Sequence, residues 1–453
     1  MRAAALRILV RVDRGGAFAD ILLDRAQRRF SDPRDRALLT ELVMGTLRWR
    51  GTLDAALAPF LKRPIETADA VSRGALRLGA YQLLFLRTPA RAVLHETVEA
   101  AKGIRGARIG GLVNAVLREW LRADPPPSRP TGANPSPDDV ARSVPPALRA
   151  ALSQSLGREE ADAFLAASLA TPPFTVRVNR LRRSREELLE RLGGAGMEPA
   201  PCVHSPDGIV LGRPAGVQAD PGLAAGEFLV TDEGAQLIAP LLAPAPGEVL
   251  LDACASPGGK ATHLAELSGG GARVVAVDLP GRLRLLRDTV SRLAPPGVTV
   301  RAHDFSRGPL PDSAGGFDKA LVDAPCTGTG VIRRNPDAKW RFSPADPGRM
   351  ARLQEAILSN VWPSVRPGGL LVYCTCTLLR EENEGVIGSF LRNRPDAVRV
   401  TEPPPGWPGP EAARTREGFL RLLPHRHGTD GFFAAILAKR GKQPRGTIDR
   451  TAA

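Results

Sequence analysis

Two segments of the sequence carry a cysteine directly after a predicted strand. The strand predicted over Lys319–Asp323 ends in the segment Asp323-Ala324-Pro325-Cys326. The strand predicted over Leu370–Thr375 is followed by Cys376. In an open sheet the carboxyl ends of parallel strands meet at one edge, where ligands bind. The pattern therefore predicts that two thiols enter the same cleft, and it leaves their use open.

Several uses of the cysteines have to be weighed. A free cysteine is most often a small buried hydrophobe, and we interpret Cys202 and Cys254 in that way. Cys374 and Cys376 are alternate residues that share a face if the strand stays extended, so they can also be redox partners. The total of five cysteines is odd and contains no C-x-x-C pair, and a cytosolic location disfavours disulfides. We expect neither a disulfide framework nor a metal site.

A glycine-rich turn follows the strand predicted over Val249–Ala253, and it points to a bound cofactor. A Gly-Gly pair at a strand-to-helix turn lets the backbone approach a ligand and leaves helix N–H groups free to bind it. We expect the cofactor loop to be Cys254, Ala255, Ser256, Pro257, Gly258, Gly259 and Lys260.

The identity of that cofactor is narrowed by what the loop lacks. A Walker A loop needs glycine where Cys254 stands and Ser or Thr where Ala261 stands, so ATP binding by that route is excluded. A G-x-G-x-x-G dinucleotide fingerprint is also missing. Asp278 nevertheless lies 20 residues beyond Gly258, where a carboxylate can bind ribose hydroxyls. A nucleoside without a pyrophosphate remains, and S-adenosylmethionine is the common one.

Three aspartates end successive predicted strands. Asp278 is expected at the ribose, Asp304 at the adenine amino group, and Asp323 beside the Pro-Cys turn. A single aspartate at the end of a strand caps a turn or a helix about as often as it binds a ligand. Three aspartates at the same ends of three strands favour a binding site.

The second half of the chain predicts an α/β fold with a parallel, doubly wound sheet, because strands and helices alternate from Gly247 onwards. The predicted strands are Val249–Ala253, Arg273–Asp278, Val298–His303, Lys319–Asp323, Leu370–Thr375 and Phe432–Ala438. The predicted helices are Lys260–Leu267, Arg282–Leu293, Pro347–Val361 and Glu381–Leu391.

The first half predicts a different organisation. Residues 1–123 follow helical spacing almost throughout, with Val71–Leu86 as an apolar central helix, and predict an all-α domain. Prolines across 124–142 predict a helix-free linker. Residues 143–240 predict a small α+β domain, with a helix over Ser184–Leu192 capped by Ser184. The sheet domain then spans 241–440, and 441–453 form a tail.

Charge and hydropathy limit the functional classes. The 453 residues include 62 basic and 48 acidic side chains, a net charge of +14, and residues 1–125 alone hold 22 basic and 13 acidic residues. This excess favours a polyanionic partner such as nucleic acid, with its main footprint at the N-terminal domain. Neither an 18-residue apolar window nor a secretory signal pattern occurs, so we expect a cytoplasmic protein without a membrane partner.

Three motifs together resemble a known family. DACASPGGK, DAPCTGTGVIRRNPDAKWR and YCTCTLLREENE are similar to the RNA cytosine-5 methyltransferases, and the order of parts resembles the bacterial ribosomal small-subunit type, called Sun or Fmu. The resemblance spans about residues 1–440. It implies a NusB-like helical RNA-binding domain before a Rossmann-like methyltransferase domain that uses S-adenosylmethionine. This chain departs from the usual family residues at Ser256, Cys374 and Thr377, and none of the three changes removes a group that the chemistry needs.

The resemblance also implies roles for the two cysteines. Carbon 5 of cytosine is a poor nucleophile, so a thiolate first adds at carbon 6 and divides one hard step into easier ones. The family pattern gives Cys376 as that nucleophile and Cys326 as the residue that assists release, with Asp323 hydrogen-bonded to the base. Lys260 can add positive potential near the thiols.

The substrate implied is a cytosine in 16S ribosomal RNA, unstacked so that its carbon 6 is accessible. Two alternatives stay open: a tRNA cytosine-5 methyltransferase, and a catalytically inactive RNA-binding assembly factor. We expect a monomer with no metal.

Overall fold

The computed structural model describes residues 1–15, 17–123 and 135–441, and it divides into two compact units. Unit 1 comprises Met1–Pro172 together with Gly328–Pro344, and unit 2 comprises Pro173–Thr327 and Ala345–Ala453. The predicted tail 442–453 and the first part of the predicted linker, 124–134, lie outside the described residues.

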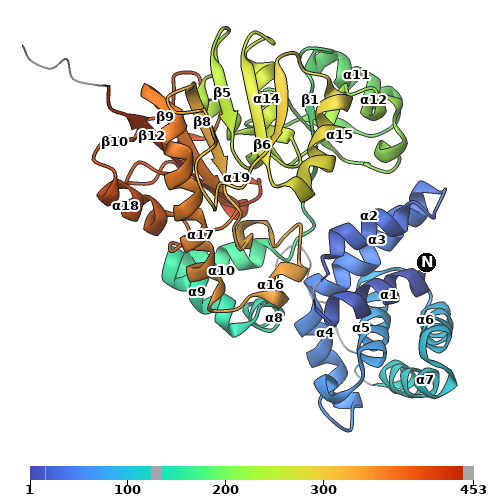
Figure 1. The fold of residues 1–453 in the computed structure, drawn as a ribbon. Coiled ribbons are helices and arrows are strands. Elements are labelled where there is room, and N and C mark those ends of the chain that lie inside the picture. The colour runs from blue at the N-terminus through green and yellow to red at the C-terminus, as the bar shows by residue number, and fades with distance from the viewer. Residues whose placement is uncertain (16, 124–134, 442–453) are drawn as a thin grey trace, which may run out of the picture. The chain divides into compact units, whose positions relative to one another are not determined.

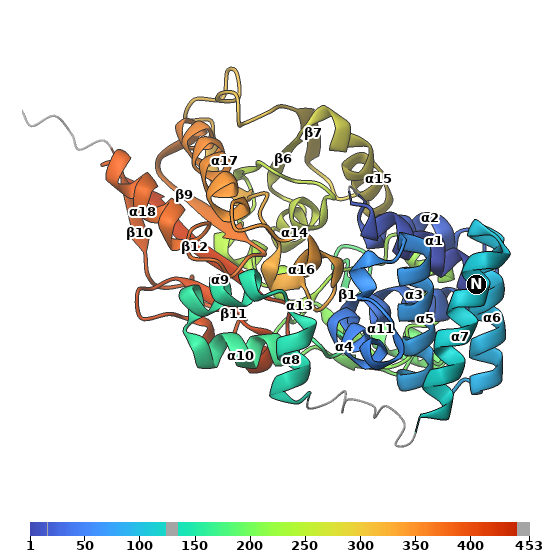
Figure 2. The ribbon, with the colours of Figure 1, turned by 90° about the horizontal axis from the view of Figure 1, so that it is seen from below.

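The described part of unit 1 is built from helices, which confirms the all-α prediction. α5 (Ala70–Phe85) is buried over most of its length, and α6 and α7 lie beside it (Figure 2). Five amphipathic helices, α1, α3, α4, α6 and α7, contact α5, each through an apolar stripe. The other helices are α1 (Arg2–Asp13), α2 (Ala19–Gln27), α3 (Pro33–Arg48), α4 (Arg50–Leu57), α6 (Ala90–Arg105), α7 (Ala107–Arg122), α8 (Pro137–Ser143), α9 (Pro146–Leu156) and α10 (Arg158–Ala167).

The expectation of a helix-free linker is wrong for its last residues, where α8 forms. Proline is tolerated in the first turn of a helix because that N–H has no partner within the helix. Pro137 occupies this position. Ser136, just before it, and Asp139, two residues after it, form a reciprocal capping box. The local capping therefore decides the structure where the overall proline content suggests a coil.

Unit 1 also contains a segment that is distant in sequence. Gly328–Pro344 follows Cys326 after one residue and includes α16 (Asp337–Arg341). Lys339 is fully buried and donates from Nζ to the main-chain oxygen of Arg48 at 2.7 Å, while Trp340 donates from Nε1 to that of Leu47 at 2.7 Å. These bonds attach the segment to the end of α3.

Unit 2 contains a small antiparallel sheet with strand order β2-β3-β1-β4. Its strands are β1 (Phe174–Val178), β2 (Pro199–Pro201), β3 (Gly208–Leu211) and β4 (Phe228–Val230). α11 (Arg185–Gly194) packs on this sheet through Leu188 and Leu192, and Ser184 caps it as predicted, through a capping box with Glu187. The helices α9 and α10, which the sequence assigned to this part, cluster with unit 1 instead.

The large sheet of unit 2 has the order β10-β12-β9-β8-β5-β6-β7 (Figure 1). Neighbours from β9 to β7 are parallel, which confirms the predicted fold class. The order reverses between β5 and β8, the position where such sheets bind ligands. The strands are β5 (Val249–Asp252), β6 (Arg273–Asp278), β7 (Val298–Ala302), β8 (Phe317–Asp323), β9 (Val365–Thr375), β10 (Ala397–Val400), β11 (Leu420–Leu422) and β12 (Phe432–Lys439).

Helices cover both faces of this sheet. One apolar core joins it to α14 (Gly259–Leu267) and α15 (Leu283–Leu293), and a second joins it to α17 (Asp346–Val361) and α18 (Glu384–Asn393). The predicted sheet differs from the observed one in two respects. The last strand, β12, runs antiparallel to β9, and the sequence analysis missed β10 and β11 beside it.

Candidate functional site

The two cysteines that follow β8 and β9 lie in contact. The Sγ atoms of Cys326 and Cys376 are 3.2 Å apart, although 50 residues separate them in the chain. Both side chains are half-buried, because each follows a strand end and lies in a turn at the edge of the sheet. The two thiols therefore meet at this edge of the sheet, as predicted, and their use stays a prediction.

Cys374 has a different environment from Cys376. It lies inside β9, is fully buried, and donates from Sγ to Oδ1 of Asp323 at 3.5 Å. Burial, with the Asp323 carboxylate next, raises the pKa of the Cys374 thiol well above its ordinary value. Cys374 belongs to one apolar core of the sheet and Cys376 packs against the same core, while the Sγ atom of Cys376 also contacts that of Cys326.

Asp323, which accepts from the Cys374 thiol, is also bonded to the predicted cofactor loop. Its Oδ2 accepts a hydrogen bond from Lys260 Nζ at 2.6 Å, so the lysine of the loop and the aspartate at the end of β8 form an ion pair. Burial opposes the charge on Lys260, but the Asp323 carboxylate outweighs it and raises the pKa of the lysine. Lys260 therefore stays charged and is fixed beside Asp323.

A cavity of about 280 Å³ opens beside this pair. The loop lines it with every predicted residue except Gly258, and Asp252, Lys260 and Asp323 are also on its wall. The opposite wall comes from the small sheet and the segment after it, through Arg177, Leu229, Val230, Thr231 and Gln236. The cavity is therefore formed jointly by the two sheets of unit 2.

Gly258 explains why this turn needs glycine. Its φ is +109°, a left-handed conformation that side chains disfavour, and a Cβ atom there would lie 3.1 Å from Leu286 and 3.2 Å from Thr289. The turn brings α14 to begin at Gly259, so the helix starts at the edge of the cavity. Backbone N–H groups at a helix start can bind a ligand.

The carboxylates of Asp278 and Asp304 accept hydrogen bonds from neighbouring turns of the chain. Asp278 accepts hydrogen bonds from the backbone N–H of Ser256 at 2.8 Å and of Leu279 at 2.7 Å. Asp304 accepts from the N–H of Ser306 at 3.0 Å and from its hydroxyl at 2.6 Å. Neither aspartate lines the cavity, so both fix turns around it and their predicted contacts with the cofactor stay predictions.

Asp252 is the residue of the cavity that the sequence analysis did not select. It is fully buried, and neither carboxylate oxygen accepts a hydrogen bond of good geometry from the described residues. Burial and the nearby Asp323 carboxylate raise the pKa of Asp252 to about 7. A buried carboxylate on the wall suits a ligand with a positive group, and S-adenosylmethionine carries both a sulfonium and an ammonium group. The residues present therefore fit this cofactor.

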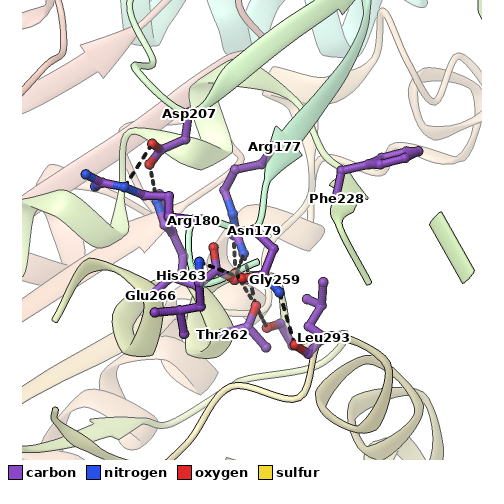
Figure 3. Close-up of polar contacts among 12 residues, drawn as sticks. Arg177, Asn179, Arg180, Asp207, Phe228, Gly259, Thr262, His263, Glu266 and Leu293 are labelled. Atoms are coloured by element: carbon purple, nitrogen blue, oxygen red, sulfur yellow. Dashed lines mark hydrogen bonds and ion pairs between the residues drawn. The ribbon is translucent and has the colours of Figure 1, made fainter. Parts of the chain in front are cut away.

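Arg177 was also missed. It projects from β1 toward α14, as Figure 3 shows, and donates to the main-chain oxygen of Gly259 at 2.6 Å, to Thr262 Oγ1 at 3.1 Å and to Glu266 Oε1 at 2.8 Å. The side chains of Arg177 and Glu266 are almost fully buried. The sequence shows an ordinary arginine in a strand, and no local spacing relates it to a glutamate 89 residues later.

Two kinds of feature are absent from the described residues. None of their helices is long and apolar enough to cross a membrane. Their histidines, cysteines and carboxylates also form no group of three or more that could hold a metal ion.

Comparisons with known proteins agree across the chain. The family model described as "16S rRNA methyltransferase RsmB/F" matches residues 239–438, the "NusB family" model matches 1–122, and a "Methyltr_RsmF/B-like, ferredoxin-like domain" model matches 144–218. The chain is 39% identical to the "Ribosomal RNA small subunit methyltransferase B" of Pseudomonas syringae pv. tomato over 420 residues, 91% of each chain. It is 38% identical to the protein of the same name from Pseudomonas putida, over 97% of this chain and 98% of the other.

Solved structures are similar as well. PH0851 has a TM-score of 0.81 at 25% identity and covers 96% of this chain and 99% of its own. NSun6 from Pyrococcus horikoshii, solved with SFG, has a TM-score of 0.57 at 25% identity and covers 65% of this chain and 98% of its own. The likeness to NSun6 thus involves about two thirds of the present chain.

Proposed function

Because the chain belongs to the 16S rRNA methyltransferase RsmB/F family and uses S-adenosylmethionine, we propose that it methylates carbon 5 of a cytosine in 16S ribosomal RNA. The reaction proceeds through a transient bond between Cys376 and carbon 6 of that base. The observation that carries this proposal is the 3.2 Å contact between the Cys326 and Cys376 thiols. Asp323, three residues before Cys326, lines the cavity proposed for the cofactor.

Different residues around the cavity bind different parts of the cofactor. The turn at Gly258 and the start of α14 admit the ligand close to the backbone, and Asp252 supplies negative charge. Asp278 and Asp304 would contact the nucleoside through the lone pairs that their turns leave free. When bound, S-adenosylmethionine supplies an electrophilic methyl group.

The thiols then account for the covalent steps. The Cys376 thiolate adds to carbon 6 of cytosine and forms a carbon–sulfur bond, which makes carbon 5 electron-rich enough to accept the methyl group. Solvent water then takes the proton from carbon 5, the electron pair of that C–H bond forms the carbon 5–carbon 6 double bond, and the carbon–sulfur bond breaks so that Cys376 leaves as a thiolate. Cys326 lies in contact with Cys376 and assists this release.

Asp323 is suited to orient the base. One of its oxygens is bonded to Lys260 and the other to the Cys374 thiol, so the carboxylate is fixed at the end of β8. A fixed carboxylate can accept a hydrogen bond from the cytosine amino group and stabilise charge during attack. A preorganised group of this kind costs no rearrangement at the moment of reaction.

RNA contacts are assigned to the basic N-terminal helices and the small sheet. Unit 1 holds Arg7, Arg11 and Arg14 as exposed side chains of α1 or of the residue that follows it. Phosphate contacts of such arginines give sequence-independent affinity. We place the reaction in the cytoplasm, where ribosomal RNA is found, and the expectation of a monomer stays a prediction.

The alternative of an inactive assembly factor is disfavoured because both thiols and the cofactor cavity are present together. A tRNA substrate is disfavoured because the relatives that match almost the whole chain are named for the ribosomal small subunit.

The proposal is tested by incubating naked small-subunit rRNA with labelled S-adenosylmethionine and mapping the modified base. Wild type should label carbon 5 of a cytosine, and Cys376→Ala should transfer no label while its affinities for RNA and cofactor stay close to wild type. Cys202→Ala is the matched control, since burial raises the pKa of that thiol to about 12. Full activity in Cys376→Ala would refute the assignment of the nucleophile.

A further inference from the structure

Glu382 is a buried carboxylate between the turns that carry the two thiols. It lies six residues after Cys376, just before α18, and its side chain is fully buried. Burying a charge is costly unless it is well hydrogen-bonded. The partners of Glu382 therefore indicate what the carboxylate does in the fold.

The hydrogen bonds of Glu382 come from the residue that follows each cysteine. Thr327, next to Cys326, donates its backbone N–H to Oε2 at 2.9 Å and its hydroxyl to Oε1. Thr377, next to Cys376, donates its hydroxyl to Oε1 at 3.1 Å. The two threonine hydroxyl oxygens are themselves 2.9 Å apart. One carboxylate thus joins both turns directly after the thiols.

A second bridge involves Gln354 of α17. Its Nε2 donates to Glu382 Oε2 at 3.0 Å and to the main-chain oxygen of Pro325 at 2.9 Å. Pro325 precedes Cys326, so this turn is held on both sides of the cysteine. The main-chain oxygen of Glu382 also accepts from the buried Tyr373 hydroxyl at 2.7 Å, which anchors the glutamate to β9.

The turn around Cys376 is held in the same way by the next residue. Asn383 is fully buried, accepts a hydrogen bond from Thr375 Oγ1 at 2.6 Å, and donates to the main-chain oxygen of Thr377 at 3.0 Å. Hydrogen bonds to Asn383 therefore hold the residues before and after Cys376. Hydrogen bonds to Glu382 and Gln354 hold the residues before and after Cys326.

We propose that Glu382 is a positioning residue that sets the separation and orientation of the Cys326 and Cys376 thiols. It touches no reacting atom and acts through Thr327 and Thr377. Its catalytic consequence rests on the proposed function, since a thiol that assists release has to stay beside the thiol that leaves. The geometric claim does not depend on methylation and can be measured alone.

The network also explains why a carboxylate is required. The four donors that point at Glu382 are two hydroxyls, one main-chain N–H and one side-chain amide, and all are neutral. An amide at this position would present its own N–H to at least one of these donors. Burial raises the pKa of Glu382 and the hydrogen bonds oppose that rise.

The experiment measures how readily the two thiols pair. Full-length protein without RNA is equilibrated with mixtures of reduced and oxidised glutathione, and the Cys326–Cys376 disulfide is quantified by mass spectrometry of its linked peptides. Oxidised glutathione accepts the two electrons and leaves as two thiols, so the equilibrium constant reports the effective concentration of one cysteine at the other. In Glu382→Gln we expect this constant to fall at least about tenfold.

Glu384→Gln is the matched control, because Glu384 lies two residues further along and pairs with Arg421. Its equilibrium constant should equal that of wild type. If Glu382→Gln folds poorly, Thr327→Val removes one donor at nearly constant volume. The constant should then fall in the same direction, and Thr327→Ser should restore it. A wild-type constant in both Glu382→Gln and Thr327→Val would overturn the proposal.

A kinetic measurement separates this proposal from the proposed function. With RNA and cofactor, Glu382→Gln should slow release of the covalent adduct more than its formation, so the adduct accumulates. If Cys376→Ala remains fully active, the proposed function fails, yet the glutathione result for Glu382 still stands or falls by itself.

Discussion

Arg177 donates from Nη1 to the main-chain oxygen of Gly259 over 2.6 Å, so the small sheet is hydrogen-bonded to the first residue of α14. The same guanidinium pairs with Glu266 about two turns further along α14, and both side chains are almost fully buried. The small sheet therefore supports the wall of the cavity proposed for the cofactor, and the arginine is part of that wall.

Replacing Arg177 tests this relationship. Arg177→Met leaves Glu266 buried and unpaired, so the stability of unit 2 should fall by about 3–5 kcal/mol. Arg177→Met/Glu266→Met removes the unpaired charge and should recover most of that stability. Both variants should still bind S-adenosylmethionine about 10- to 100-fold more weakly, because Gly259 loses a charged donor. Calorimetric affinities close to wild type in the stable double variant would show that the arginine acts on stability alone.

Asp252 predicts a pH dependence of cofactor binding. Its pKa is raised to about 7, so a substantial fraction of the carboxyl groups is protonated in the free protein near neutral pH. A bound positive group favours the ionised form, so binding should release protons and affinity should rise as pH increases from about 6 to about 8. Asp252→Asn should bind more weakly and without this dependence. Calorimetry in buffers of different ionisation enthalpy measures the released protons, and their absence in wild type would contradict the prediction.

His263 predicts a loss of stability in acid. It is buried beside Asp207, with 3.2 Å between Nε2 and Oδ2, and burial, with Arg177 next, lowers its pKa to about 4 from 6.5. Between these two pH values the unfolded chain binds the proton and the folded chain does not. The free energy of unfolding of unit 2 should therefore fall as pH decreases through this window, by up to about 3 kcal/mol.

The measurement for His263 is hydrogen exchange of α14 peptides, which reports unit 2 separately. His263→Gln keeps a side-chain amide that can donate to Asp207 but has no titration in this range, so its profile should be flatter than that of wild type. His95→Gln, a change at an exposed histidine of unit 1, is the control and should follow wild type. Parallel profiles for wild type and His263→Gln would exclude the histidine as the cause.

Salt should weaken RNA binding steeply if phosphate contacts dominate. Each phosphate contact contributes about −0.7 to the log–log slope for single-stranded RNA. Replacing Arg7, Arg11 and Arg14 together by Gln should make the slope shallower by about 2 if all three contact phosphates. Filter binding at several salt concentrations measures the slope, and an unchanged slope would remove this face of unit 1 from the RNA footprint.

The sequence predicted most of the elements that carry the site, because strand and helix periodicity is local. β5, β6, β8 and β9 end within one or two residues of the predicted positions, and the glycine turn lies where the motif predicts it. The prediction failed where a partner strand decides the structure. The residue pattern of β12 is typical of a buried strand and does not indicate its direction. The antiparallel direction follows from its pairing with β9.

Side-chain partnerships were the second limit. The three strand-end aspartates were expected to bind ligand, yet Asp278 and Asp304 first satisfy the N–H groups of their own turns. Glu382 belongs to a quoted motif, but its role depends on Thr327, 55 residues earlier. Such contacts are formed by tertiary packing, which neither residue type nor spacing encodes locally.

The most direct test of the covalent mechanism uses Cys326→Ala with 16S rRNA and S-adenosylmethionine, followed by denaturation and mass spectrometry of the protein–RNA adduct. The account predicts a denaturation-resistant adduct in which Cys376 Sγ is bonded to a methylated cytosine, absent from Cys326→Ala/Cys376→Ala. An adduct at another residue, or normal turnover of Cys326→Ala without any adduct, would contradict it.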